Sequence, residues 1–210
     1  MKTIAHRGYW KTEGEKNSIG ALFRALDAGY GFETDLRDYC GQLVISHNIA
    51  DESCTSAEKI FEYYHKRECA VQLALNVKAD GIQDLLERLL EKYSIKNYFL
   101  FDMSVPEQVV YKNRGITFYT RHSDIEESCV LYEHAAGVWL DSFYYDEWLT
   151  EDVIHRHIDA GKPVCIVSPE LHQKPQGRVW KMLKDCCLHK SELVSLCTDI
   201  PDNAKEYFGL

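Results

Sequence analysis

The sequence predicts an α/β fold, a compact (β/α)8 TIM barrel formed by residues 1–210 as a single domain. Eight short runs of strand-forming residues alternate with segments of helical period, the pattern of a parallel sheet with crossover helices. Eight such units in 210 residues fit a barrel near the lower size limit of that fold. An open doubly wound sheet is the alternative, but the stretch HRGYWKTEGEKNS after the first strand lacks a glycine-rich phosphate-binding motif.

The predicted strands share a high content of β-forming side chains. They are residues 2–6, 31–37, 71–78, 98–103, 116–121, 138–143, 163–168 and 193–198. After the second strand, Tyr39, Cys40 and Gly41 read as a turn that leads into the stretch QLVISHN.

Two helices between the strands are well marked. In the first, Ile19, Leu22, Phe23 and Leu26 recur at helical spacing, with Asn17 or Ser18 as the N-cap and Gly29 at the end. In the second, one apolar stripe follows Asp80, which is placed to cap the helix. That stripe consists of Ile82, Leu85, Leu86, Leu89 and Leu90.

The composition excludes two classes of partner. The formal net charge is −9, whereas nucleic-acid phosphates and anionic lipid surfaces attract an excess of lysine and arginine. No apolar run has the length of a membrane span, so we expect no stable membrane insertion. Eight cysteines show no paired metal-ligand spacing and no secretory segment precedes them. We therefore expect a cytoplasmic protein whose cysteines, including the adjacent Cys186 and Cys187, are reduced and mostly packed in the core.

Charged side chains gather at the ends of the first two predicted strands. His6 and Arg7 close the first strand, and Glu33 and Asp35 lie two residues apart on the second. The carboxyl ends of barrel strands form the face that carries active sites. Residues two apart on a strand face the same side, and two neighbouring buried carboxylates are costly unless a cation binds them. This spacing predicts a metal site.

The third strand and the segment after the second add further polar groups. Asn76 and Lys78 share one face at a strand end, and His47 lies a short distance past the turn. Carboxylate and amide oxygens suit a hard divalent cation that polarises a phosphoryl oxygen. Arg7 and Lys78 can stabilise charge on a phosphorane-like transition state, and two histidines can act as general base and general acid. These residue types predict cleavage of a phosphodiester.

Short motifs resemble those of the glycerophosphodiester phosphodiesterases and the related barrel phospholipase C and D enzymes. The segments AHRG, KNS, FETD, VISHN and NVK follow the family's order from Ile4 to about Lys78. Near the end, CTDIPDNA is similar to the family's T-D-x-P-D-x-A. The middle of the chain matches only as alternating strand and helix units.

The resemblance implies a barrel of the PLC-like phosphodiesterase type. It implies a phosphoric diester hydrolase that acts on a small glycerophosphodiester-like molecule in lipid metabolism. The implied roles are His6 and His47 as the acid/base pair, Arg7 on the phosphate, and Glu33 and Asp35 on a divalent metal.

The sequence departs from the family at several of these positions. Asn76 stands where the family has a glutamate, but related phospholipase C barrels use asparagine as a ligand, so we count it as the third metal ligand. We add Lys78 as a second phosphate-binding cation and expect Mg²⁺, with Ca²⁺ as the alternative. Asn48 replaces the aspartate after the second histidine, and Lys16 replaces a glutamate. The long insertion that usually follows the second histidine is nearly absent.

Other polar residues fall at or just past strand ends, where they can face the same mouth. They are Asp102, His122, Asp141, Glu170 and His172. Asp102 and Asp141 can orient substrate hydroxyls or cap helices, and both interpretations stay open.

Two further groups are weighed against simpler explanations. His155 and His157 lie two apart on a predicted helix and face different ways, so we expect no shared metal. Tyr144, Tyr145 and Trp148 form an aromatic loop that can act as a substrate lid or cover the core, and packing is the favoured interpretation.

Three functional interpretations follow. The first, which we favour, is a metal-dependent phosphodiesterase with two-histidine catalysis, in which water attacks directly or opens a cyclic phosphate intermediate. The second is a barrel that binds a phosphorylated ligand with weak or no turnover, motivated by Asn76 and Asn48. The third is a lyase whose final product is the cyclic phosphate. A matched histidine pair beside two carboxylates favours an enzyme over mere binding.

Overall fold

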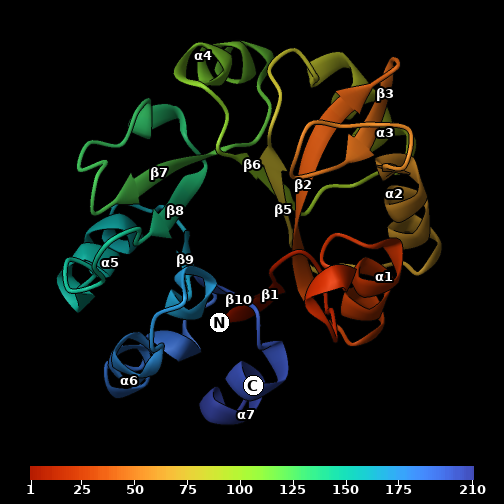
Figure 1. Ribbon diagram of the computed structural model, residues 1–210. Helices are drawn as coiled ribbons and strands as arrows, with labels where there is room; N and C mark the ends of the chain where they lie inside the picture. The colour runs from red at the N-terminus through yellow and green to blue at the C-terminus, as the bar shows by residue number, and fades with distance from the viewer.

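The computed structural model describes all 210 residues and contains a curled, mainly parallel sheet surrounded by helices (Figure 1). Each of the eight predicted strands is present close to its expected position. These strands are β1 (Lys2–Ala5), β2 (Gly31–Tyr39), β5 (Leu73–Val77), β6 (Tyr98–Phe101), β7 (Tyr119–Ser123), β8 (Gly137–Asp141), β9 (Val164–Val167) and β10 (Val194–Thr198).

The two ends of the chain meet in the sheet. β1 pairs in parallel with both β2 and β10, and the ladders continue from β10 through β9 and β8 to β7 and from β2 through β5 to β6. Between β6 and β7 there is only an isolated parallel bridge, Leu100 to Phe118, with the Leu100 amide donating to the Thr117 carbonyl at 3.1 Å. The prediction is thus confirmed as a mixed α/β fold with a curled sheet, whose ladder is interrupted at the β6–β7 junction.

Seven α-helices lie around the outside of the sheet (Figure 1). They are α1 (Ile19–Asp27), α2 (Ala57–Lys66), α3 (Gln83–Lys92), α4 (Val105–Arg114), α5 (Glu151–Asp159), α6 (Gly177–Asp185) and α7 (Pro201–Phe208). The connection from β7 to β8 has no α-helix and contains only a 3-10 turn, Tyr132–His134. None of the helices combines the length and apolar character that a membrane crossing requires.

The predicted start of α1 is confirmed, and that of α3 is wrong. Ser18 caps α1, because its hydroxyl accepts from the Ala21 amide at 3.2 Å. Asp80 does not cap α3; its carboxylate accepts from the Ser104 hydroxyl at 2.7 Å instead. A carboxylate from α4, that of Glu107, accepts from the Gly81 amide at 2.8 Å just before α3 begins.

An antiparallel excursion extends β2 beyond the parallel sheet. β3 (Gln42–Ile45) pairs with the last residues of β2, and the short β4 (Thr55–Ser56) pairs with β3. The predicted turn between β2 and β3 is confirmed, with Cys40 and Gly41 both in the left-handed region at φ values of 48° and 75°, as a two-residue hairpin turn requires. This excursion delivers His47 to the end of β3.

Nine apolar side chains fill the inside of the curled sheet, and two larger clusters pack between sheet and helices. Side chains alternate along a strand, so Ile4 lies in the inner cluster while Ala5 faces the helices. His6 therefore emerges on the inner side, directly above Ile4.

The cysteines are all unpaired, but most of them are not core residues. Only Cys165 and Cys197 are buried, and Cys187 is exposed. Cys186 is partly exposed and donates to the Glu151 carboxylate at 2.8 Å. The expectation of mostly core cysteines, including this adjacent pair, is therefore wrong.

Candidate active site

A tight turn after β1 places the first two candidate residues. Arg7 and Gly8 both have positive φ, 54° and 86°. A side chain at Gly8 would begin 2.8 Å from the backbone carbon of Ala21 in α1, so only glycine allows this approach. The amide of Tyr9 donates to the Ala21 carbonyl at 2.8 Å and fixes the turn against the helix. His6 and Arg7 are thereby held at the carboxyl end of the sheet.

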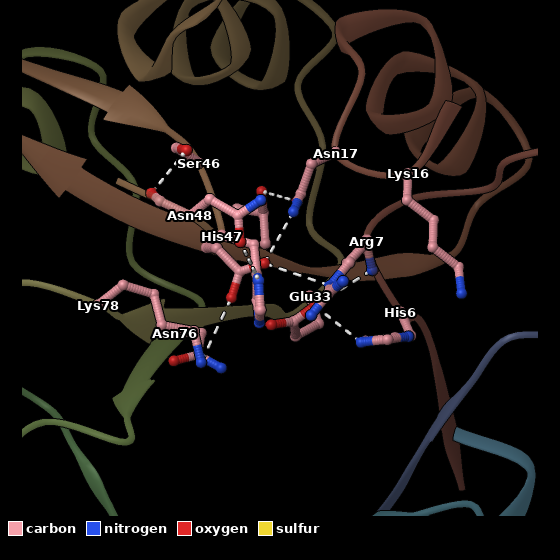
Figure 2. Close-up of polar contacts among 12 residues, drawn as sticks. His6, Arg7, Lys16, Asn17, Glu33, Ser46, His47, Asn48, Asn76 and Lys78 are labelled. Atoms are coloured by element: carbon pink, nitrogen blue, oxygen red, sulfur yellow. Dashed lines mark hydrogen bonds and ion pairs between the residues drawn. The ribbon is translucent and has the colours of Figure 1, made fainter. Parts of the chain in front are cut away.

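Glu33 and Asp35 lie side by side and are almost completely buried, with 2% and 0% of their surface exposed. The Arg7 amide donates to Glu33 Oε2 at 3.1 Å (Figure 2). The guanidinium Nε of Arg7 lies 3.2 Å from Asp35 Oδ2. Asn17 Nδ2 donates to the same Asp35 oxygen at 2.7 Å. The predicted shared orientation of the two carboxylates is present.

Burial and, second, the negative charge of Asp35 raise the pKa of Glu33 to about 7, although the charges of His6, Arg7 and Lys78 oppose this rise. A buried carboxyl with such a pKa is partly protonated near neutral pH. A bound cation would favour the ionised form and relieve the repulsion between the two carboxylates.

Asn76 of β5 completes an oxygen-rich group with these carboxylates. It stands opposite Asp35 in the parallel register of β2 and β5. The Asn76 amide nitrogen donates to Asp102 Oδ2 at 3.1 Å, which leaves its oxygen unused. Both Asn76 Oδ1 and Asp35 Oδ1 are buried without a hydrogen-bond partner. Unpaired buried oxygens are costly, and carboxylate and amide oxygens are the ligands of Mg²⁺ and Ca²⁺, so these residues fit a hard divalent cation.

His6 is oriented by a residue from the other end of the chain. Its Nδ1 lies 2.7 Å from Asp199 Oδ1, and its Nε2 lies 3.8 Å from Glu33 Oε2. Burial alone would raise the pKa of Asp199, but the hydrogen bond and charge of His6 and the charge of Lys16 outweigh it and lower that pKa. The ionised Asp199 therefore holds one ring nitrogen and directs the other toward the carboxylates.

A second carboxylate supports Asp199. Glu170 accepts from the Asp199 amide at 3.2 Å and also from the hydroxyls of Thr198 and Ser168. It thus ties the ends of β9 and β10 together behind the histidine. Glu170 lies near the mouth, as predicted, but one layer behind His6.

His47 arrives at the same end of the sheet from β3 (Figure 2). The amide of the preceding Ser46 donates to the Asp35 carbonyl at 3.0 Å, which anchors the segment beside the carboxylates. The side chain of His47 is exposed, and its Nδ1 lies 3.2 Å from Asn48 Oδ1. No hydrogen bond joins His47 to His6; the partner of the His6 ring is Asp199.

Two cationic side chains, Lys78 and Arg121, pair with Asp102, the residue that follows β6. Lys78 Nζ lies 3.7 Å from Asp102 Oδ2 and 3.6 Å from Asp35 Oδ1, and Arg121 pairs with Asp102 Oδ1 at 2.5 Å. Burial raises the pKa of Asp102, although Arg121 and Lys78 oppose this. Asp102 also has a positive φ of 67°, a conformation that is uncommon for a non-glycine residue.

Neither of the two predicted mouth aspartates caps a helix. Ser104 caps α4, and Thr150 caps α5. Asp141 accepts from the His172 ring at 2.7 Å and from the Ser142 amide at 2.8 Å. Asp102, Asp141 and His172 therefore belong to the polar mouth, as candidates for contacts with a substrate.

Arg121 is the mouth residue that the sequence analysis missed, and His122 was placed there wrongly. β7 runs from Tyr119 to Ser123, and Tyr119 belongs to the inner cluster, so Arg121 faces inward and His122 outward. His122 meets His157 of α5 at 3.0 Å on the helix side of the sheet.

The aromatic loop after β8 has two different parts. Tyr144 and Tyr145 are 77% and 50% exposed, so they do not cover the core. Trp148 stacks at an angle on the His122 ring, with the centroids 4.8 Å apart. The favoured packing role is confirmed for Trp148 and wrong for the two tyrosines.

The fold is similar to solved structures of phosphodiesterases. A glycerophosphodiester phosphodiesterase from Agrobacterium tumefaciens matches with a TM-score of 0.71 at 15% identity, over 99% of this chain and 98% of the other. One from Parabacteroides distasonis matches with a TM-score of 0.67 at 19% identity, over 99% and 96%. A phosphodiesterase from Oleispira antarctica, solved in complex with the product sn-glycerol-3-phosphate, matches with a TM-score of 0.73 at 14% identity, over 100% and 97%.

No protein-family model and no curated protein matches the chain. At such low identities, a structural likeness over almost the whole of both chains establishes the fold. The resemblance to glycerophosphodiester phosphodiesterases is confirmed at that level.

Proposed function

We propose that this chain is a metal-dependent phosphoric diester hydrolase that cleaves a small glycerophosphodiester-like substrate. The observation that carries the proposal is the convergence of His6, Arg7, Glu33 and Asp35 at one end of the sheet, beside two buried oxygens, Asp35 Oδ1 and Asn76 Oδ1, that accept no hydrogen bond. Buried oxygens without a hydrogen bond are costly, and a bound cation would give them the missing partner.

Glu33, Asp35 and Asn76 would hold the divalent cation, Mg²⁺ with Ca²⁺ as the alternative, which on binding withdraws electron density from a phosphoryl oxygen. The guanidinium of Arg7 and the ammonium of Lys78 flank the carboxylates and would bind the remaining phosphate oxygens. With the cation bound, these two side chains would help to offset the negative charge that develops as the nucleophile approaches.

His6 and His47 would divide the proton transfers. The ionised Asp199 stabilises positive charge on His6, which suits this ring to accept the proton of the attacking water or substrate hydroxyl. The exposed His47 would donate a proton to the departing alcohol as the bond from phosphorus to the alcohol oxygen breaks. Attack by water gives a phosphomonoester directly, whereas attack by a neighbouring hydroxyl gives a cyclic phosphate first.

The finer fold assignment is part of the same proposal. The cyclic order of eight parallel strands, with a single bridge between β6 and β7, supports a (β/α)8 barrel of the PLC-like phosphodiesterase type in which one crossover lacks its helix. The product bound to the Oleispira antarctica enzyme makes glycerophosphodiesters the first substrates to test.

The test is release of alcohol from a panel of glycerophosphodiesters with Mg²⁺ or Ca²⁺, followed by ³¹P NMR to identify the phosphate product. We expect turnover that EDTA abolishes, and a loss of about 10²–10⁴-fold in His6→Ala and His47→Ala. His155→Ala is the matched control, because His155 is exposed on α5 and lies outside the site. A folded, metal-loaded protein that binds phosphate but turns over no diester would contradict the proposal, and a cyclic phosphate as the final product would replace hydrolysis by the lyase reaction.

A further inference from the structure

A second polar cluster lies on the outer side of the sheet, apart from the candidate active site. It consists of His122 from β7, Cys129 from the β7–β8 connection and His157 from α5. One ligand atom of each lies within 4.8 Å of the others. We refer to these three residues as the outer cluster.

The outer cluster occupies the place where the helix layer is incomplete. The β7–β8 connection has no α-helix, so the segment that carries Cys129 lies against β7 and α5 instead. On α5 the two histidines point apart as predicted, because His155 is 43% exposed on its side chain whereas His157 is 3% exposed. His157 therefore faces His122, a partner that the spacing of the two helix histidines could not reveal.

The surroundings hold the two rings in one orientation. The Tyr132 hydroxyl lies 3.0 Å from His157 Nδ1, and His157 Nε2 lies 3.0 Å from His122 Nδ1. Trp148 covers the His122 ring. Metal-binding histidines characteristically use one ring nitrogen for the metal and the other for a fixed hydrogen bond of this kind.

We propose that His122, Cys129 and His157 bind Zn²⁺ at a site distinct from the candidate active site. Two imidazole nitrogens and one thiolate form a soft donor set that suits Zn²⁺ and not Mg²⁺. Zinc bonds of about 2.0–2.1 Å to nitrogen and 2.3 Å to sulfur place neighbouring ligand atoms about 3.3–3.7 Å apart. The two histidine nitrogens are 3.0 Å apart, and all three ligand atoms lie within 4.8 Å of one another. Small rotations of the side chains can therefore bring the ligand atoms to the distances that the ion requires.

The protons of the three side chains are accounted for on binding. Each imidazole would bind through the lone pair of a neutral ring nitrogen. The Cys129 thiol would release its proton to solvent, and its sulfur would bind as a thiolate.

The role that follows is structural. The ion would fasten the β7–β8 connection to β7 and α5, where other crossovers are fastened by packing of a helix. This inference rests on the outer cluster alone and stands whether or not the chain hydrolyses diesters.

Titration of the metal-free protein with Co²⁺, a coloured substitute for Zn²⁺, tests the site. We expect one equivalent to give a thiolate-to-cobalt charge-transfer band that Zn²⁺ displaces. Cys129→Ser should lose the band, and His157→Gln should weaken binding at least tenfold. Cys187→Ser and His155→Gln are matched controls, because the Cys187 thiol and the His155 ring are accessible and lie outside the cluster.

Glu33→Gln tests whether the outer cluster binds metal independently of the candidate active site. This variant should keep the thiolate-to-cobalt band unchanged. If the cluster variants do not fold, the wild-type protein still decides the question, because Zn²⁺ should slow alkylation of Cys129 but not of Cys187, as read by mass spectrometry. Absence of the band, a band that survives in Cys129→Ser, or alkylation of Cys129 unaffected by Zn²⁺ would overturn the proposal.

Discussion

The hydrogen bond between Asp199 and His6 fixes which ring nitrogen of the histidine faces the carboxylates. We predict that Asp199→Asn lowers kcat by about 10²-fold, because an amide neither stabilises the protonated ring nor enforces its tautomer. KM should change little, since Asp199 does not reach the phosphate-binding cations of the site. Steady-state kinetics on the best substrate of the panel measures both constants. A rise in KM with kcat unchanged would mean that Asp199 acts through substrate binding instead.

Asp199 also makes the stability of the chain depend on pH. Its pKa is lowered in the folded protein, so its ionised form stabilises the fold above the unfolded value of about 3.9, and this contribution disappears as the pH falls through the lower folded value. Asp199→Asn should therefore be less stable than the wild type at pH 7, by about 1–2 kcal/mol, and nearly equal to it near pH 2. Urea unfolding at the two pH values measures the difference. A constant difference at both would contradict the assignment.

Glu33 is predicted to serve function at the expense of stability. In the metal-free protein its pKa of about 7 exceeds the unfolded value of about 4.3, so the folded state binds more protons between these values and loses stability as the pH rises through them. Glu33→Gln should then be more stable than the wild type in EDTA at pH 8, by about 1–3 kcal/mol, with no difference near pH 4. Its amide oxygen can still accept from the Arg7 amide.

Chemical unfolding in EDTA at both pH values checks this expectation, together with the metal-dependent activity of the same variant. Activity should be lost while stability is gained. A variant that is less stable at pH 8 would show that Glu33 serves the fold and not a cation.

At the scale of elements, the turn between β1 and α1 is the most constrained connection of the site. Gly8 and Gly29 both have positive φ, but a side chain would clash with the α1 backbone only at Gly8. We predict that Gly29→Ala costs about 1 kcal/mol from backbone strain alone, whereas Gly8→Ala costs about 2–5 kcal/mol because α1 must also move. The Gly8 variant should lose activity as well, since His6 and Arg7 belong to the same turn. Unfolding midpoints and kcat of both variants measure the contrast, and equal costs would contradict it.

The strands could be predicted because each is a short apolar run, and the local pattern determines such runs. The side of the sheet on which a residue lies was harder to predict at strand ends. β7 continues to Ser123, two residues past the predicted end, so His122 lies within the strand. Because Tyr119 faces inward, alternation places Arg121 inside and His122 outside.

The candidate site was predictable where its residues follow consecutive strands and unpredictable where sheet closure brings them together. His6, Glu33 and Asp35 were found from local spacing. Asp199 lies in a noted motif, but its role depends on the pairing of Ala5 with Thr198 across β1 and β10, which no local pattern encodes. The partnership of His122 with His157 likewise depends on how α5 packs on the sheet.

At the scale of the molecule, stacked aromatic rings compensate for the interrupted ladder between β6 and β7. Inside the sheet, the Phe99 and Tyr119 rings stack with centroids 3.8 Å apart, and Phe101 stacks on Trp139 at 3.9 Å. These pairs connect β6 to β7 and β8 across the junction where only the Leu100 bridge exists. Contact between side chains therefore holds this part of the sheet together where backbone hydrogen bonds are few.

This arrangement predicts where the molecule opens first. Phe99→Leu removes a ring from the junction, whereas Phe61→Leu removes an equally buried ring of α2, and each should cost about 1–2 kcal/mol in global stability. The Leu100 amide donates across the β6–β7 junction to the Thr117 carbonyl. Only Phe99→Leu should speed hydrogen exchange of this amide, because local opening of the junction breaks only the contacts that cross it. Native-state hydrogen exchange by NMR measures this amide against those of β1 and β10. Equal acceleration in both variants would mean that the sheet opens as a whole and that the stacked rings do not hold the junction.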